Sequence, residues 1–188
     1  MMKTKKLSLR TSYLTMFLLF ILVCSYSCKK ENFKVLPPET QTGQNTLGCL
    51  IDDELYFGGY LPPLGHQAIG AEYHKISKML IIDSYGEMNG KTAGSLSIEI
   101  DNEPRQDSVQ KIFHASYLPY PRSSECFMFS VVDEGEICVT KFDTINKIVS
   151  GRFQFIGRCS DDMFRSAGTA TKQITQGRFD IKLDVYNQ

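Results

Sequence analysis

Near the end of the chain, residues 178–185 alternate strictly between charged and apolar side chains. The apolar positions are Phe179, Ile181, Leu183 and Val185, and the charged positions are Arg178, Asp180, Lys182 and Asp184. A period of two places alternate side chains on opposite faces of a β-strand, one toward a core and the other toward water. The same period recurs at residues 47–51, 69–74, 96–100 and 149–155. We therefore predict an all-β domain, either an antiparallel β-sandwich or an open barrel.

Turn signals separate several of these segments. Asp52-Asp53 predicts a turn, and the Gly- and Pro-rich residues 56–65 are typical of a loop. Residues 133–136 (DEGE) predict a hairpin between strands at 127–132 and 137–142. A second turn at 143–147 would lead into the strand that starts at Ile148.

Two further segments have less certain patterns. The continuous apolar run at 79–82 is typical of a strand that is buried on both faces. Residues 107–117 are a candidate for one short helix, because Asp107 can cap it and Val109, Ile112, Phe113 and Ser116 would share a face. Ten residues are marginal for a helix, so strand and loop remain alternatives.

The N-terminal residues have the features of an export signal. Lys3, Lys5, Lys6 and Arg10 precede an apolar run at 13–24, which as a helix would span only about 18 Å of a hydrocarbon core about 30 Å thick. Small Ser27 stands directly before Cys28, as a bacterial lipoprotein signal requires. We predict cleavage after residue 27 and acylation of Cys28, with fatty acids such as palmitate; ordinary cleavage without a lipid is the alternative.

This assignment divides the chain into three parts. Residues 1–27 are the predicted signal peptide, residues 28–46 the lipidated cysteine with a polar, flexible tether, and residues 47–188 a single β-sandwich domain. Cleavage lowers the 21 Lys and Arg residues to 17, against 21 Asp and Glu. The net charge of −4 and the lack of a long basic run argue against nucleic acid as a partner.

Four cysteines remain in the predicted domain: Cys49, Cys126, Cys138 and Cys159. An oxidising compartment permits disulfides among them, and free buried thiols are the alternative. In the predicted hairpin, Cys126 and Cys138 would lie roughly 17 Å apart, so that pairing is the least favoured. The spacing of these cysteines and the histidines predicts no metal site, and no motif predicts a cofactor.

Three segments resemble one family of uncharacterised lipoproteins from Bacteroidota-type bacteria. They are residues 36–49 (LPPETQTGQNTLGC), residues 139–143 (VTKFD) with 148–153 (IVSGRF), and residues 174–180 (ITQGRFD). The resemblance implies a β-rich fold at the cell envelope and carries no activity. Read from the residues alone, Gly151 and Gly177 mark bulges or tight turns, and Phe153 and Phe179 belong to the core.

These features predict that the protein is located at the outer membrane. Lys29-Lys30-Glu31 resembles a sorting signal that sends such lipoproteins to the outer face of that membrane, although it is less acidic. The protein is therefore expected to face either the periplasm or the cell surface, attached to the membrane by its N-terminal lipid.

No residue pattern identifies a reaction, and we expect no enzyme and no catalytic residue. The histidines, His66, His74 and His114, are isolated in sequence, and no nucleophile elbow or P-loop is present. The alternative is a hydrolase that uses Asp or Glu side chains with one of these histidines, which would require convergence in one pocket. A purely structural envelope role is the third hypothesis.

A binding module is the favoured hypothesis. Aromatic residues on stiff Gly- and Pro-rich segments can offer apolar faces to sugars or peptides. The candidate ligand-binding residues are Tyr56, Phe57, Tyr60, Tyr117 and Tyr120. The expected partners are a glycan or an envelope protein.

Overall fold

The computed structural model describes residues 35–59, 68–122, 126–132, 134–160 and 169–187. The predicted signal peptide and Cys28 lie outside these ranges. The strands are β1 (Thr46–Ile51), β2 (Glu54–Gly58), β3 (Ile69–His74), β4 (Met79–Met88), β5 (Lys91–Ile100), β6 (Val109–Lys111), β7 (His114–Pro119), β8 (Met128–Val132), β9 (Glu136–Asp143), β10 (Ile148–Ser160) and β11 (Thr171–Tyr186). No helix occurs in the described ranges, and thus none that could cross a membrane.

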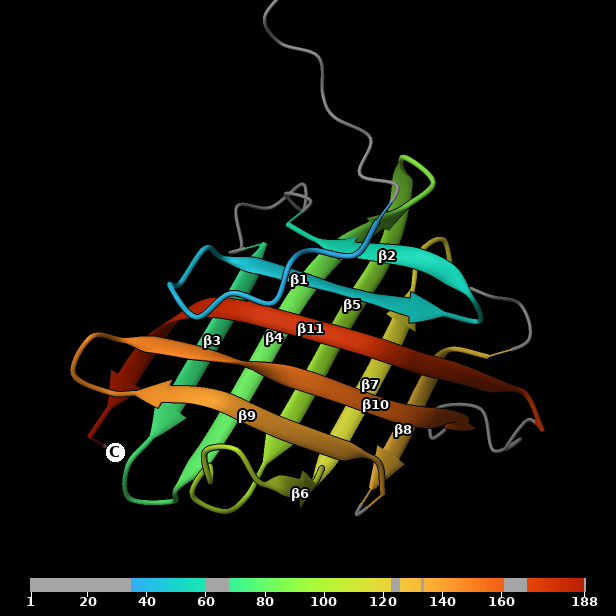
Figure 1. Ribbon diagram of the computed structural model, residues 1–188. Helices are drawn as coiled ribbons and strands as arrows, with labels where there is room; N and C mark the ends of the chain where they lie inside the picture. The colour runs from blue at the N-terminus through green and yellow to red at the C-terminus, as the bar shows by residue number, and fades with distance from the viewer. Residues whose placement is uncertain (1–34, 60–67, 123–125, 133, 161–168, 188) are drawn as a thin grey trace, which may run out of the picture. The chain divides into compact units, whose positions relative to one another are not determined.

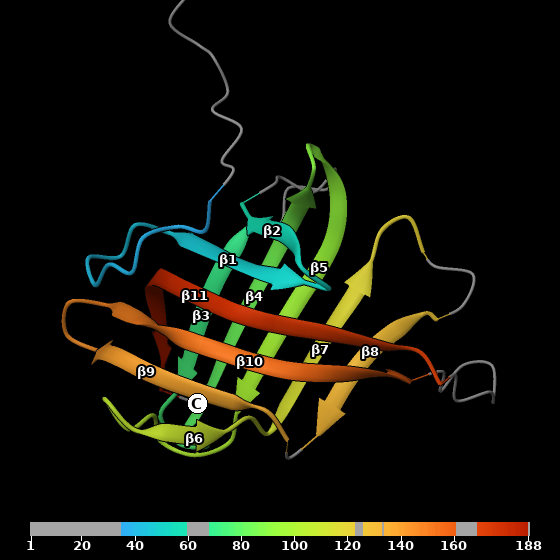
Figure 2. The ribbon, with the colours of Figure 1, turned by 45° about the vertical axis from the view of Figure 1, so that its right-hand side comes forward.

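The strands form one 11-stranded sheet that folds into two layers. Its order is β2-β1-β11-β3-β4-β5-β7-β8-β10-β9-β6, with β2–β4 and β11–β10 as additional pairs. Figure 1 shows β1, β11, β10 and β9 in the front layer and β3, β4, β5, β7 and β8 crossing behind them. The view in Figure 2 confirms this layering and shows β6 beside β9 at the lower edge. We call the two groups the front layer and the back layer.

Long strands connect the layers. β11 pairs with β10 in the front layer, whereas its last residues, from Leu183 to Tyr186, pair with β3. β10 pairs with β9 along its first half and with β8 at its end. The prediction of an all-β fold is confirmed. The sheet is mixed rather than purely antiparallel, because the β11–β3 pair is parallel.

The core is built from the inward faces of the alternating strands, as predicted. The buried residues include Leu47, Ile51, Leu96, Ile98, Val149, Phe153, Phe155, Phe179, Ile181 and Leu183. The prediction that residues 79–82 are buried on both faces is wrong. Leu80 and Ile82 are buried, but Met79 and Ile81 are partly exposed, because β4 also has one inward face and one outward face.

The candidate helix at 107–117 is wrong. These residues form β6 and the start of β7. A helix would have placed Val109 and Phe113 on its buried face, yet both side chains are exposed. Instead Ala115 and Tyr117 point inward with the period of a strand, and β7 pairs with β5. Packing against the core therefore decides the conformation of this segment.

The turn predictions had mixed outcomes. Asp52 and Asp53 form a two-residue turn between β1 and β2, both with positive φ, and residues 143–147 connect the paired strands β9 and β10. The hairpin predicted at 127–142 is wrong. β8 pairs with β7 and β10, so the chain passes from the back layer to the front layer between β8 and β9.

The same change of layer determines the cysteine pairing. Cys126 and Cys159 form a disulfide, because the start of β8 lies beside the end of β10. Cys49 is a free, buried thiol, and burial raises its pKa far above the ordinary value. Cys138 is also free and is partly exposed on β9.

Two phenylalanines lie over two glycines on neighbouring strands. Phe153 is opposite Gly177, and Phe179 is opposite Gly151. A Cβ atom at Gly177 would come within 2.6 Å of the Phe153 ring, and one at Gly151 within 2.8 Å of the Phe179 ring. The reading of these residues as structural is therefore supported: the glycines make room for core rings, next to irregularities in the β9–β10 and β10–β11 registers.

Candidate functional site

Residues 35–45, which we call the N-terminal segment, run along β1 in Figure 1. The sequence predicts a flexible tether at residues 28–46, but within this range residues 37–44 contact side chains of β10 and β11. Its contacts centre on Asp180, whose carboxylate accepts hydrogen bonds from the Thr40 hydroxyl (2.6 Å) and the Gly43 backbone N–H (2.8 Å). The backbone N–H groups of Thr42 and Gln44 also donate to it, at 3.1 and 3.2 Å.

Asp180 is 1% exposed although the strand period directs it away from the core. Ser150, opposite it on β10, donates a further hydrogen bond of 2.7 Å. Burial by itself raises the pKa of Asp180, but the hydrogen bonds from Thr40, Ser150, Gly43 and Gln44 outweigh it and hold the pKa below its ordinary value. The carboxylate therefore remains ionised and fastens the N-terminal segment to the sheet.

Next to this contact, two arginines lie directly opposite each other. Arg152 on β10 pairs in register with Arg178 on β11, and both side chains are on the outer face. The Glu39 carboxylate lies between them, 3.8 Å from Arg152 Nε and 3.5 Å from Arg178 Nε. Arg178 Nη1 also donates to the Pro37 carbonyl at 3.3 Å. The N-terminal segment thus supplies both the carboxylate and a positioning carbonyl.

These charged groups border an open groove of about 300 Å³, which we call the arginine groove. Besides Glu39, Arg152 and Arg178, its lining includes Val109, Cys138 and Glu136. Glu136 accepts a hydrogen bond of 3.0 Å from the Gln154 side chain, which also lines the groove. The groove therefore has two planar, positively charged guanidinium groups beside a wall that contains both apolar and polar side chains. Guanidinium groups bind carboxylates and phosphates well, so this arrangement is suited to holding an anionic group.

Of the aromatic residues predicted to bind a ligand, the four that the structure describes do not share one surface, because two of them are buried in the core. Tyr56 and Phe57 lie in β2 rather than in a loop, and Tyr56 is 0% exposed. Its hydroxyl is 3.0 Å from Ser84 Oγ, and Tyr117, also buried, donates to the Ala93 carbonyl at 2.9 Å. These two tyrosines cannot present ring faces to a ligand from the core, which corrects that prediction for them.

The remaining aromatic candidates have other environments. Tyr120 is 58% exposed, just after β7, and Phe57 is partly exposed. Tyr60 lies outside the described residues. Burial raises the pKa of Tyr117 to about 12 and that of Tyr56 further, so both hydroxyls stay protonated as hydrogen-bond donors within the core.

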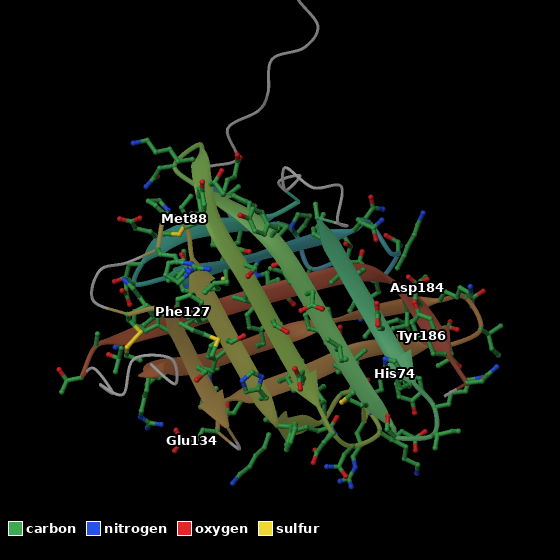
Figure 3. The ribbon with its side chains drawn as sticks, turned by 180° about the vertical axis from the view of Figure 1, so that it is seen from behind. His74, Met88, Phe127, Glu134, Asp184 and Tyr186 are labelled. Atoms are coloured by element: carbon green, nitrogen blue, oxygen red, sulfur yellow. A yellow bond between two sulfur atoms is a disulfide. The ribbon has the colours of Figure 1, made fainter. Side chains whose placement is uncertain are left out.

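The two described histidines lie apart. His74 on β3 is 3.6 Å from Glu72 and stacks on Tyr186, and Figure 3 shows His74 beside Tyr186. His114 on β7 is 3.6 Å from Glu99. Because β4 and β5 separate β3 from β7, these pairs are roughly 14 Å apart across the sheet. His66 lies outside the described ranges. The structure does not bring His74 and His114 together in one pocket.

Sequence reasoning missed the Asp180 contact and the arginine groove. The signal was present in part, since Glu39, Arg152 and Arg178 belong to the three segments singled out above. Nothing in the sequence shows that these segments meet. Among the described residues, no group of three or more His, Cys, Asp or Glu side chains could hold a metal ion. No family model, no curated protein and no solved structure matches this chain.

Proposed function

We propose that this protein is a lipid-anchored protein of the outer membrane, facing the periplasm or the cell surface, that acts as a non-enzymatic binding or accessory module. The address rests on the residues around Cys28 and on the resemblance to envelope lipoproteins. The binding role rests on the arginine groove. Paired arginines on an outer sheet face are suited to recognition, whereas a hydrolytic reaction needs convergent acids and bases.

The reach of the anchor supports a position close to the membrane. The N-terminal segment is attached to the sheet through Asp180, so any free linker lies before it. From Cys28 to Val35 the chain can span at most about 25 Å. A lipid on Cys28 would therefore keep the arginine groove near the membrane surface, within reach of envelope glycans and proteins.

A binding experiment tests this function. The full chain, solubilised in detergent, is applied to arrays of bacterial glycans, peptides and envelope proteins, beside an Arg152→Gln/Arg178→Gln double variant. We expect a ligand that the unaltered protein retains and the double variant loses. Lys78→Gln, which removes an exposed ion pair with Glu103, is the matched control and should bind normally. If the unaltered protein retains nothing, the recognition role is wrong.

The hydrolase and the purely structural role remain the alternative proposals. A hydrolase would use His74 with Glu72, or His114 with Glu99, and would lose turnover when the histidine is replaced. A structural role predicts envelope defects on deletion without any ligand for the arginine groove. Each gives a different result in the array and turnover measurements.

A further inference from the structure

We infer that the Glu39 carboxylate occupies the place of a ligand carboxylate. The arginine groove binds a molecule with one carboxylate, which displaces the Glu39 side chain from between Arg152 and Arg178. This inference rests on the binding function proposed above and names the chemistry of its ligand. It is carried by the register of Arg152 and Arg178, by the length of the Glu39 contacts and by the charges around the groove.

An anion between the two arginines lowers their mutual repulsion. Directly opposite residues on antiparallel strands have Cβ atoms about 4.5–5.5 Å apart, and like charges in such pairs destabilise a sheet. Arg152 and Arg178 are opposite in register, and both side chains lie on the outer face, 57% and 31% exposed. An anion between the two guanidinium groups offsets their repulsion. In this structure, Glu39 supplies that anion.

Glu39 makes only long contacts with the two arginines. Its contacts of 3.8 and 3.5 Å exceed the roughly 2.7–2.9 Å of a direct charge-assisted hydrogen bond. Its side chain is 46% exposed, so water can reach the carboxylate. A ligand carboxylate that forms parallel N–H···O bonds to one arginine, while remaining close to the other, would bind these groups better than Glu39 does.

Exchange of Glu39 does not require the N-terminal segment to detach. The neighbouring residue, Thr40, donates to Asp180 at 2.6 Å, and Gly43 donates at 2.8 Å. Arg178 is held independently by the Pro37 carbonyl. The Glu39 side chain can therefore turn into solvent by rotation about its own bonds while the groove keeps its shape.

The surrounding charges select a single carboxylate. Arg152 and Arg178 are balanced by Glu39 and by Glu136, which also lines the groove. When Glu39 turns out, the three groups that remain, Arg152, Arg178 and Glu136, have one net positive charge. A monoanionic group neutralises that charge, whereas a dianion such as hydrogen phosphate, the main form of phosphate at pH 8, would meet Glu136 with a second negative charge. Acidic sugars and free peptide carboxylates have the required chemistry.

Titration with sodium D-glucuronate tests the inference. The full chain in detergent micelles, labelled with ¹⁵N-arginine, is observed through its arginine Nε–H signals, which are assigned with Arg152→Lys and Arg178→Lys variants. We expect both signals to shift saturably. In Glu39→Gln the half-saturating concentration should fall about two- to fivefold, because an exposed ion pair no longer competes. Glu103→Gln, which alters a different exposed ion pair, should match the unaltered protein.

Two results would overturn the inference. One is the absence of a saturable shift in Glu39→Gln, and the other is a shift that survives in Arg152→Gln/Arg178→Gln. Inorganic phosphate is titrated in parallel, and equal saturation by phosphate would refute the selection of a carboxylate. If an array ligand is lost in the arginine double variant while glucuronate causes no shift, the proposed binding function stands and the carboxylate assignment fails.

Discussion

Asp180 is a buried carboxylate whose described partners are all neutral. Two hydroxyl groups and three backbone N–H groups donate to it. Successive backbone N–H groups from residues 42–44 converge on the anion, as in a backbone nest. Hydrogen bonds to a charged group contribute more to stability than neutral ones, and an orphaned buried partner is costly. Asp180 therefore supplies five of the hydrogen-bond contacts around which the N-terminal segment and the sheet are joined, beside the contacts of Pro37 and Glu39 with the arginines.

Replacing this carboxylate tests its role. Asp180→Asn keeps the size of the side chain but removes the charge and one acceptor, so we expect a loss of about 3 kcal/mol in the free energy of unfolding. Urea unfolding followed by circular dichroism measures this change. Asp184→Asn, at an exposed position of the same strand, is the control and should change the free energy by less than about 0.5 kcal/mol. Equal effects of the two substitutions would contradict the assigned role.

Stability should also depend on pH through the same residue. The pKa of Asp180 is lower in the folded protein than the ordinary value of about 3.9. Below about pH 4 the unfolded chain therefore binds more protons than the folded one. The contribution of Asp180 is complete above that pH and is lost as pH falls through the folded-state pKa. Hydrogen bonds from Asn146 likewise lower the pKa of Asp143 to about 2.

An acid titration of unfolding checks this dependence. The midpoint urea concentration of the unaltered protein should be level from pH 6 to about pH 4 and decrease below it. Asp180→Asn should show a smaller decrease over the same range, because Asp143 and other carboxyl groups still titrate. Identical pH profiles for the two proteins would show that the Asp180 carboxylate does not contribute.

Strand period and local turns were the elements that sequence predicted well. Alternation located the inward residues of β10 and β11, and Asp52-Asp53 marked a turn. Local patterns did not predict strand pairing where contacts between distant parts of the sequence determine it. β8 and β9 are separated by only a few residues, yet they lie in different layers because β8 pairs with β7 and β10. The Asp180 contact was hidden for the same reason, since its partners in the N-terminal segment are more than 130 residues away.

The disulfide links two elements at this change of layer. Cys126 and Cys159 join the start of β8 to the end of β10 across a sequence separation of 33. Closing a loop of that length restricts the unfolded chain by about 3–4 kcal/mol. We expect Cys126→Ser/Cys159→Ser to lose roughly this free energy of unfolding under oxidising conditions. Cys138→Ser, at a free thiol, is the control, and an equal loss there would contradict the pairing.

At the scale of the whole molecule, the two layers of the sheet support the arginine groove, which lies on the outer face of the front layer. The front layer carries Arg152 and Arg178 on adjacent strands, while its other face packs on the core. Sequence predicted an all-β domain, but it could not predict that β11 would pair with both β10 and β3. β3 lies near the start of the domain and β10 and β11 near its end, so no local pattern in the sequence reveals that β11 pairs with both.

The central claim is that a lipid on Cys28 holds this domain at the cell envelope. The most direct measurement is membrane fractionation of cells that express the full chain or Cys28→Ala, combined with metabolic labelling by an alkyne-bearing fatty acid. We predict that the unaltered protein is labelled and sediments with membranes, and that Cys28→Ala is unlabelled and released by a carbonate wash. Persistent labelling and membrane retention of Cys28→Ala would contradict the claim.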